Sequence, residues 1–200
     1  MNTSPLPTDK LTGVILAGGK GRRFGSDKAF ALYRGERLID RTVRVMGEIF
    51  RDVGIVTNFP GKYGSVPATI WADEIPFQGP AGGIVTALRA VNTEAIFVVA
   101  CDLPLLSGKV ILNLMEKENG ASLVLYQHAR GLEPLCALYR KELLPRLEQR
   151  LQSGRGDLYS LADERGVTVQ KIPLDRWGRE SLRNLNRVGD LKSLLKRKQP

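Results

Sequence analysis

A glycine-rich, cationic stretch directly follows the apolar run 11–16. It carries four glycines and four cations in the order Leu16-Ala17-Gly18-Gly19-Lys20-Gly21-Arg22-Arg23-Phe24-Gly25-Ser26-Asp27-Lys28. A strand that ends in glycines exposes backbone N–H groups, and neighbouring cations add positive charge, which together suit a chain of phosphates. The alternative is an ordinary turn with solvated basic side chains. We therefore take a nucleotide as the first ligand to consider.

The spacing of this stretch excludes two familiar phosphate loops. A P-loop needs glycine, four residues and then Gly-Lys-Ser/Thr, and no glycine here has Gly-Lys at that offset. A dinucleotide fingerprint needs G-x-G-x-x-G, but after Gly19 and Gly21 the third position is Phe24, one residue before Gly25. The stretch is thus a phosphate loop of another kind.

An aspartate follows the most apolar run of the chain, 95–100. Asp102 stands in Cys101-Asp102-Leu103-Pro104, where it either caps the next helix or holds a metal ion. Ser107 is already a competent helix cap, which reduces the need for Asp102 in that role. Mg²⁺ prefers one or two carboxylates together with phosphate oxygens and water. Beside a phosphate loop, the metal hypothesis gains weight.

A second aspartate, Asp73, follows the apolar run 68–71 and precedes Gly79-Pro80-Ala81-Gly82-Gly83. One interpretation is a surface turn that leads into a helix, because proline and small residues suit a first helical turn. The other is a nucleotide contact, in which Gly82 and its neighbours let the backbone approach a base or ribose and Asp73 accepts hydrogen bonds from it.

Composition narrows the classes of protein. The 200 residues carry a net charge of +9 and 42% hydrophobic residues, which suits one compact domain. The five cations Lys20, Arg22, Arg23, Lys28 and Arg34 gather around the glycine stretch, and no RNA-binding aromatic motif is present, so we expect a small anionic substrate and no nucleic acid.

Targeting and redox features are few. No run approaches the ~20 apolar residues of a membrane helix, and the start has no apolar signal region. We expect a flexible lead-in over 1–10, a single domain over 11–200, no membrane contact and a cytoplasmic location. Cys101 and Cys136 lie far apart in apolar runs, which favours buried free thiols, and His128 is the sole histidine, so zinc chemistry has little support.

Strand-like and helical patterns alternate along the chain. Strands are predicted over 12–17, 53–57, 68–71, 95–100, 122–126 and 134–139, and helices over 38–50, 81–91, 109–117 and 141–151. Such alternation predicts an α/β domain with a mainly parallel sheet and helices on both faces. The less regular segment 155–187 is where we expect a strand pair that leaves the main sheet.

Several of these segments together resemble the molybdenum cofactor guanylyltransferase family, over about residues 12 to 194. They are Leu16 to Gly19 with Arg23 and Lys28, Asp73, Gly79 to Gly83, Cys101 to Pro104, Glu133-Pro134-Leu135-Cys136-Ala137-Leu138-Tyr139 and Asn184-Leu185-Asn186. The glycine stretch and Asp102 are shared with a wider superfamily of nucleotidyltransferases, whereas the Gly79 and Glu133 segments are narrower and carry the resemblance.

The resemblance implies a single-domain, three-layer α/β/α Rossmann-like nucleotidyltransferase fold. It implies Mg²⁺-dependent transfer of GMP from GTP to the terminal phosphate of molybdenum-molybdopterin, with release of pyrophosphate. The further partners it suggests are transient ones, namely other cofactor-biosynthesis proteins or molybdoenzymes.

Site residues carry over by position. Nucleotide contacts are expected from Leu16, Ala17, Gly18, Gly19, Gly21, Asn58, Asp73 and Gly82. Lys28 is expected at the phosphates, with Arg23 and Lys28 offsetting their charge. Asp102 is the expected Mg²⁺ ligand, with Asn186 as a second one.

The chain departs from the family pattern at one place, and two alternative functions remain open. The chain reads Asn184-Leu185-Asn186-Arg187-Val188 where relatives commonly show Asn-x-Asn-Thr-Pro, which leaves the start of the next helix open. A related transferase directed to CTP or to a sugar phosphate is one alternative. A nucleotide-binding module without turnover is the other.

Overall fold

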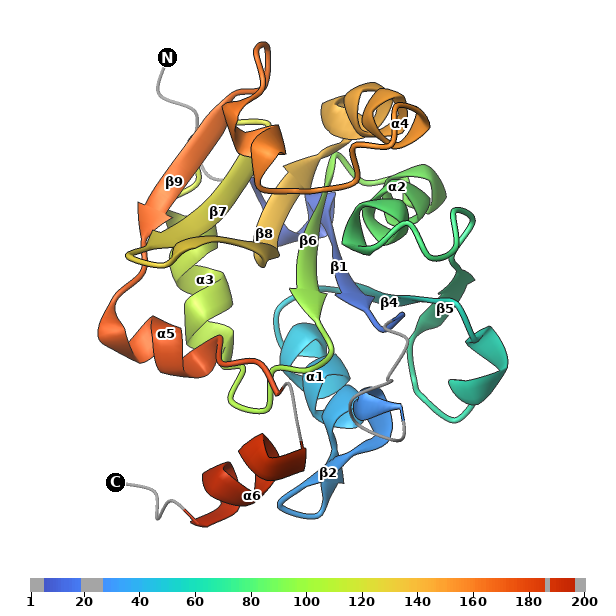
Figure 1. The fold of residues 1–200 in the computed structure, drawn as a ribbon, viewed down its shortest axis with the longest axis vertical. Helices are drawn as coiled ribbons and strands as arrows, with labels where there is room; N and C mark the ends of the chain where they lie inside the picture. Colours follow the sequence, from blue (N-terminus) through green and yellow to red (C-terminus); the bar gives the residue numbers. More distant parts are fainter. Residues whose placement is uncertain (1–5, 19–26, 186–187, 197–200) are drawn as a thin grey trace.

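The computed structural model describes residues 6–18, 27–185 and 188–196. Within these ranges the centre of the molecule is one seven-stranded sheet in the order β5-β4-β1-β6-β8-β7-β9 (Figure 1). The strands are β1 (Leu11–Leu16), β4 (Asp52–Thr57), β5 (Thr69–Ala72), β6 (Ala95–Ala100), β7 (Leu123–His128), β8 (Gly131–Arg140) and β9 (Val169–Pro173). Only β8 runs antiparallel to its neighbours β6 and β7. The predicted α/β class with a mainly parallel sheet is confirmed.

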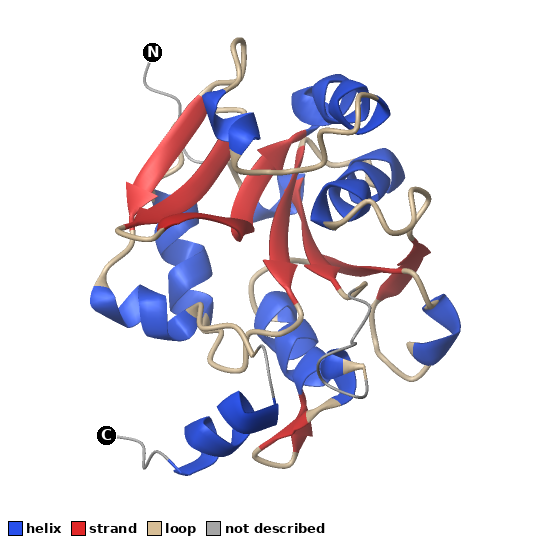
Figure 2. Cartoon of the chain, viewed as in Figure 1, coloured by secondary structure: helices blue, strands red, loops and turns tan. Residues whose placement is uncertain are grey.

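Helices cover both faces of this sheet (Figure 2). On one face lie α2 (Pro80–Ala90) and α4 (Leu144–Gln152), and on the other lie α1 (Leu38–Gly47) and α3 (Gly108–Glu116). Two further helices follow late in the chain, α5 (Arg176–Ser181) and α6 (Val188–Lys196). Within the described ranges, no helix has the length and apolar composition needed to cross a membrane.

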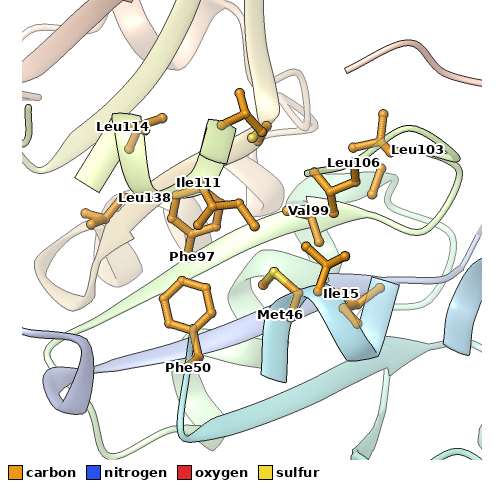
Figure 3. Packing of buried hydrophobic residues seen from close by; sticks show 14 of the residues in the cluster. Ile15, Met46, Phe50, Phe97, Val99, Leu103, Leu106, Ile111, Leu114 and Leu138 are labelled. Carbon is orange, nitrogen blue, oxygen red and sulfur yellow. The ribbon is translucent and has the colours of Figure 1, made fainter. Parts of the chain in front are cut away.

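The larger hydrophobic core lies between the sheet and the α1 and α3 helices. Figure 3 shows Phe50 and Met46 facing Phe97 of β6, and Ile111 and Leu114 of α3 closing the same layer. The Phe50 and Phe97 rings stack with their centroids 5.6 Å apart. All six residues of β6 are buried, as a central strand covered on both faces requires. This packing holds the paired β1 and β6 strands in the centre of the fold.

Strand direction determines which loops meet. Because β1, β4, β5 and β6 are parallel neighbours, the segments that follow them all leave the sheet at its carboxyl edge. Because β8 is antiparallel to β6 and β7, the β7–β8 hairpin turn lies at that edge as well. Ligands of open α/β sheets bind at this edge.

One expectation about strands and one helix end were wrong. In the segment 155–187, the described residues 155–185 hold no strand pair outside the sheet, because β9 joins the sheet edge in parallel with β7. The excursion occurs instead at β2 (Leu32–Tyr33) and β3 (Glu36–Arg37), a short antiparallel pair. Its two turn residues, Arg34 and Gly35, have φ of 54° and 84°, the left-handed values of a two-residue hairpin turn. The predicted helix over 38–50 ends earlier, at Gly47.

Short 3₁₀ turns complete the fold. They are η1 (Thr8–Lys10), η2 (Lys28–Phe30), η3 (Pro60–Lys62), η4 (Lys141–Leu143) and η5 (Ser160–Asp163). The helix predicted over 141–151 therefore begins as η4 and becomes α4 only from Leu144. Pro145 stands in the first turn of α4, where its missing N–H costs nothing.

Arg150 of α4 is a charged side chain in the core. It is 3% exposed, and it donates hydrogen bonds to Glu164, to the Asp157 carbonyl and to the Ser160 hydroxyl. These bonds tie the segment 157–164, which is irregular apart from η5, to the rigid α4 helix. A buried charge that loses its partner is costly, because the remaining charge stays without water.

We expect Arg150→Met to lower the free energy of unfolding by about 2 kcal/mol or more, because the Asp157 carbonyl and the Ser160 hydroxyl lose a buried donor and Glu164 keeps only its pair with Arg146. Urea denaturation measures the loss. The matched control is Arg89→Met, which breaks the exposed pairs with Glu74 and Glu148 and should cost under about 1 kcal/mol. Equal losses in the two variants would contradict a special role for the buried network.

Candidate functional site

Lys28 and Asp102 face each other at the carboxyl edge. Lys28 Nζ lies 3.4 Å from Asp102 Oδ2 and donates a hydrogen bond to the Leu185 carbonyl at 2.8 Å. The Leu185 N–H in turn donates to the Asp102 carbonyl at 2.9 Å. Asp27 positions the lysine, because it caps η2 by accepting from Ala29 N–H at 3.2 Å. Three segments distant in sequence thus meet around one ammonium group.

The Asp102 carboxylate is available for a cation. Ser107 caps α3 by accepting a hydrogen bond from Lys109 N–H, so Asp102 does not serve as the helix cap. Burial raises the pKa of Asp102, and the charge of Lys28 opposes that shift. A partly desolvated carboxylate with a single nearby cation gains from further positive charge. Of the two interpretations, the helix cap is thus excluded, and a metal ion at Asp102 stays a prediction.

Two side chains from the β4–β5 connection hold the described ends of the glycine stretch. Tyr63 donates its hydroxyl proton to the Ala17 carbonyl at 3.2 Å, and the same oxygen lies 3.5 Å from Asp27 Oδ2. Asn58 Nδ2 donates to the Gly18 carbonyl at 3.1 Å. Both sides of the stretch are therefore anchored to one connection.

Several backbone groups expected to contact a nucleotide already have internal partners. Ala17 N–H donates to the Val56 carbonyl at 2.9 Å, and the Leu16 carbonyl accepts from Cys101 N–H at 3.2 Å. Among the described residues no acceptor takes the Gly18 N–H, which makes it the first backbone donor of the stretch open to a ligand.

Asn58 has an unusual acceptor. Its Oδ1 is buried and has no hydrogen-bond partner among the described residues, which is a costly state for a polar atom. A Cβ added at Gly18 would lie 2.8 Å from Asn58 Nδ2, so only glycine lets the carboxamide sit this close. The pair is therefore arranged to present one unsatisfied acceptor beside the start of the glycine stretch.

Asp73 and Gly82 also lie together, for an internal reason. Asp73 Oδ1 accepts from Ile75 N–H at 3.1 Å and from the Thr86 hydroxyl at 3.2 Å. A Cβ at Gly82 would lie 2.7 Å from the Ile75 carbonyl. Burial raises the pKa of Asp73. These contacts hold the turn before α2 against the helix, so both residues have a packing role, and their contact with a nucleotide stays a prediction.

A cavity of about 210 Å³ opens beside the Lys28–Asp102 pair. Its lining includes Leu103 and Asn184, which are next in sequence to Asp102 and Leu185. Pro80 at the start of α2 forms another side, and the remaining walls come from the start of β8 and from residues 156–159. The cavity thus lies between the described nucleotide-site candidates and the segment that Arg150 holds.

The predicted site residues divide into those that the structure brings together and those it does not describe. Leu16, Ala17, Gly18, Asn58, Asp73, Gly82, Lys28 and Asp102 all lie at the carboxyl edge. Gly19, Gly21, Arg23 and Asn186 lie outside the described residues. Both cysteines are free thiols, as predicted; Cys136 is buried and Cys101 is partly so.

Sequence reasoning missed Tyr63, the Leu185 carbonyl and Glu133. Tyr63 lies in a loop between strands and shows no periodic signal. Leu185 acts through its backbone, which leaves no trace in residue type. Glu133 stands out in the sequence only as part of a family segment, and His128 only as the sole histidine. The signal that could have paired them is the β7–β8 hairpin, in which the two residues lie on facing strands.

The family model for the MobA-like NTP transferase domain matches residues 13–168. A probable molybdenum cofactor guanylyltransferase of Carboxydothermus hydrogenoformans is 31% identical over 93% of this chain and 95% of its own. A molybdenum cofactor guanylyltransferase of Desulfosudis oleivorans is 37% identical over 74% of each chain.

Solved structures agree on the fold. A protein of Aquifex aeolicus VF5 superposes with a TM-score of 0.76 at 28% identity, covering 90% of this chain and 95% of its own. The molybdopterin-guanine dinucleotide biosynthesis protein A of Archaeoglobus fulgidus superposes with a TM-score of 0.79 at 24% identity, over 91% and 95% of the two chains. The glycine stretch, the edge aspartate and the sheet order thus have a common explanation: the chain belongs to the MobA-like NTP transferase family and is a nucleotidyltransferase.

Proposed function

We propose that the protein transfers GMP from GTP to the terminal phosphate of molybdenum-molybdopterin, with release of pyrophosphate. The observation that carries the proposal is the Lys28–Asp102 pair, which stands between the glycine stretch and a separate cavity. A transferase of this kind needs a place for a triphosphate, a charged centre at the α-phosphate and room for an acceptor on the other side. The curated relatives named above agree in substrate.

The chemistry asks little of acid–base groups. The acceptor phosphate is already ionised at neutral pH, so its oxygen attacks the α-phosphorus without a general base. One P–O bond forms, the bond to the β-phosphate oxygen breaks, and pyrophosphate leaves with the electron pair. The barrier is electrostatic, because two anions meet, and fixed positive charge lowers it. Lys28 supplies such a charge, and Arg23 adds to it in this proposal.

The Lys28 ammonium group is already held in place before a phosphate binds. Its Nζ is held by the Leu185 carbonyl and lies within reach of Asp102. An ammonium group held by neutral and anionic partners needs little rearrangement when a phosphate arrives. Asn58 Oδ1 and Gly18 N–H are the acceptor and donor that we assign to the nucleotide, because neither has a partner among the described residues.

Mg²⁺ fits the donor set that the structure presents. Asp102 offers a carboxylate whose burial favours an added cation, and we assign Asn186 as a second ligand. Among the described residues no three metal-ligating side chains cluster, which suits an ion that takes most of its ligands from phosphate and water. When bound, Mg²⁺ would offset negative charge on the phosphates.

The proposal also covers the cellular location and the partners of the protein. We infer that the protein works in the cytoplasm on GTP and molybdenum-molybdopterin. We also infer transient contact with other cofactor-biosynthesis proteins or molybdoenzymes, which supply the acceptor or receive the product.

The test is to incubate the protein with Mg²⁺, each of the four nucleoside triphosphates and the molybdenum-loaded pterin, and to measure pyrophosphate release. We expect release with GTP that requires the pterin. Release with CTP alone would move the protein to the CTP-directed transferases, and release that requires a sugar phosphate would change the acceptor. Nucleotide binding without any release would identify a module without turnover.

We expect Asp102→Ala to keep the fold and to lower turnover about a hundredfold or more, because the residue that places the positive charge is lost. Steady-state pyrophosphate release measures turnover, and circular dichroism checks the fold. The control is Asp52→Ala, an exposed aspartate at the start of β4, on the opposite edge of the sheet. Near-normal GMP transfer by Asp102→Ala would contradict the assignment.

We expect Lys28→Ala to raise the KM for GTP and to lower kcat, each by about tenfold, because one charge-assisted contact to the phosphates is removed. The control is Lys10→Ala, which removes a lysine at the opposite edge that pairs with Glu94. Unchanged GTP affinity and rate in Lys28→Ala would contradict the assignment and leave Lys28 with only its internal contacts to Leu185 and Asp102.

A further inference from the structure

The β7–β8 hairpin brings the chain's histidine against a glutamate at the carboxyl edge. His128 pairs with Gly131, and Tyr126 pairs with Glu133, beyond a shift in register after Leu125. His128 Nδ1 accepts a hydrogen bond from Arg130 N–H at 3.0 Å. A ring nitrogen that accepts carries no proton, so Nε2 bears it and donates to Glu133 Oε1 at 2.7 Å. The backbone of the hairpin thus sets the tautomer that orients Glu133.

Glu133 lines the cavity beside Asp102. The side chain of Asp157 lies in the same lining but is engaged by Ser160 and lies 3.4 Å from Arg150. Among the described residues, Oε2 of Glu133 has no hydrogen-bond partner. Its neighbours in the lining include Leu103, Leu135 and Leu182. The cavity therefore offers one oriented carboxylate in a mainly apolar lining, to which Tyr159 and Asn184 add further polar groups.

The oriented carboxylate and the apolar lining together indicate which chemical group fits the cavity. A carboxylate repels phosphate, so the phosphates of either substrate belong at Lys28 and not here. An ionised carboxylate is an acceptor only, and it binds best to two parallel N–H donors. The apolar lining suits a flat heterocycle, and at about 210 Å³ the cavity is below the ~300 Å³ of a typical ligand site. It has room for one end of a substrate.

The edge of a 2-amino-4-oxopyrimidine ring carries two such donors, a ring N–H and an amino group. Guanine and pterin both have this edge. The position of the cavity distinguishes the two rings. Asn58 and the glycine stretch, which we assign to the nucleotide, follow β4 and β1, whereas the cavity lies where β6 meets the antiparallel β8. The nucleotide and the acceptor then approach the Lys28–Asp102 pair from opposite sides.

We propose that Glu133, oriented by His128, binds the N–H edge of the acceptor's pterin ring and so determines which acceptor the enzyme takes. This rests on the proposed function. Glu133 contacts the acceptor, and His128 is a positioning residue that acts through Glu133.

The test compares Glu133→Gln and Glu133→Leu with the unaltered protein in titrations with free pterin and, separately, with guanosine. We expect both variants to weaken pterin binding about tenfold or more, because a charge-assisted pair of hydrogen bonds is lost. Guanosine binding should stay within about twofold. Glu148→Gln is the matched control, since Glu148 is similarly exposed but lies on α4 and pairs with Arg89.

Turnover adds a second readout. In the GMP-transfer assay, Glu133→Gln should raise the KM for the molybdenum-loaded pterin and leave the KM for GTP unchanged. His128→Ala should do the same more weakly. His128→Gln, whose amide nitrogen is able to donate to Glu133, should restore the acceptor KM, which a purely structural role of the ring would not predict.

Three results would overturn the proposal: no pterin binding by the unaltered protein, pterin binding by both Glu133 variants that equals that of the unaltered protein, or a loss confined to guanosine. Failure of the proposed function looks different. In that case the unaltered protein transfers no GMP to the pterin acceptor, while the pterin titration still reports whether Glu133 recognises the ring.

Discussion

The shared direction of β1, β4, β5 and β6 is the constraint on which the candidate site depends. Each of these strands ends at one edge of the sheet, so the glycine stretch, Asn58, Asp73 and Asp102 gather there although up to 85 residues separate them. The core beneath, with Phe50 stacked on Phe97, packs against these strands and holds them in place. The arrangement of the residues at this edge therefore depends on packing in the core, away from the edge itself.

The antiparallel β8 strand divides that edge into two halves. On the β1 side the described groups are backbone N–H, amide and lysine, which suit phosphate and nucleotide. On the β8 side the hairpin, the residues held by Arg150 and the apolar lining form a cavity that suits an uncharged ring. In our proposal the phosphates of both substrates and the ring of the acceptor have different electrostatic needs, and one strand reversal lets a single sheet meet both.

Much of the fold is predictable from local pattern. The long apolar runs predict the central strands, and Ser107 predicts the start of α3, because burial and capping are properties of neighbouring residues. Strand order is not local, which is why the place of β9 beside β7 and the reversal of β8 could not be foreseen. The β2–β3 turn was missed because Arg34, which adopts a positive φ there, is not a typical turn residue.

The candidate site, like the fold, was predictable where the signal is local and was not where it depends on residues distant in sequence. Lys28 and Asp102 were predictable because their residue types carry charge to the ends of recognisable strands. Tyr63 was not, since its hydroxyl acts on the Ala17 carbonyl from a loop with no regular pattern. The packing role of Gly82 was also hidden, because the space beside it is filled by the Ile75 carbonyl from another segment.

Lys28 is held on one side by a peptide oxygen, that of Leu185. Every amino acid supplies such an oxygen, so the contact itself places no demand on the identity of residue 185. It depends instead on the length of chain that leads there from α5. The position of this oxygen is therefore sensitive to insertions and deletions, whereas Leu185 itself is kept apolar by its burial in the core and not by the contact with Lys28.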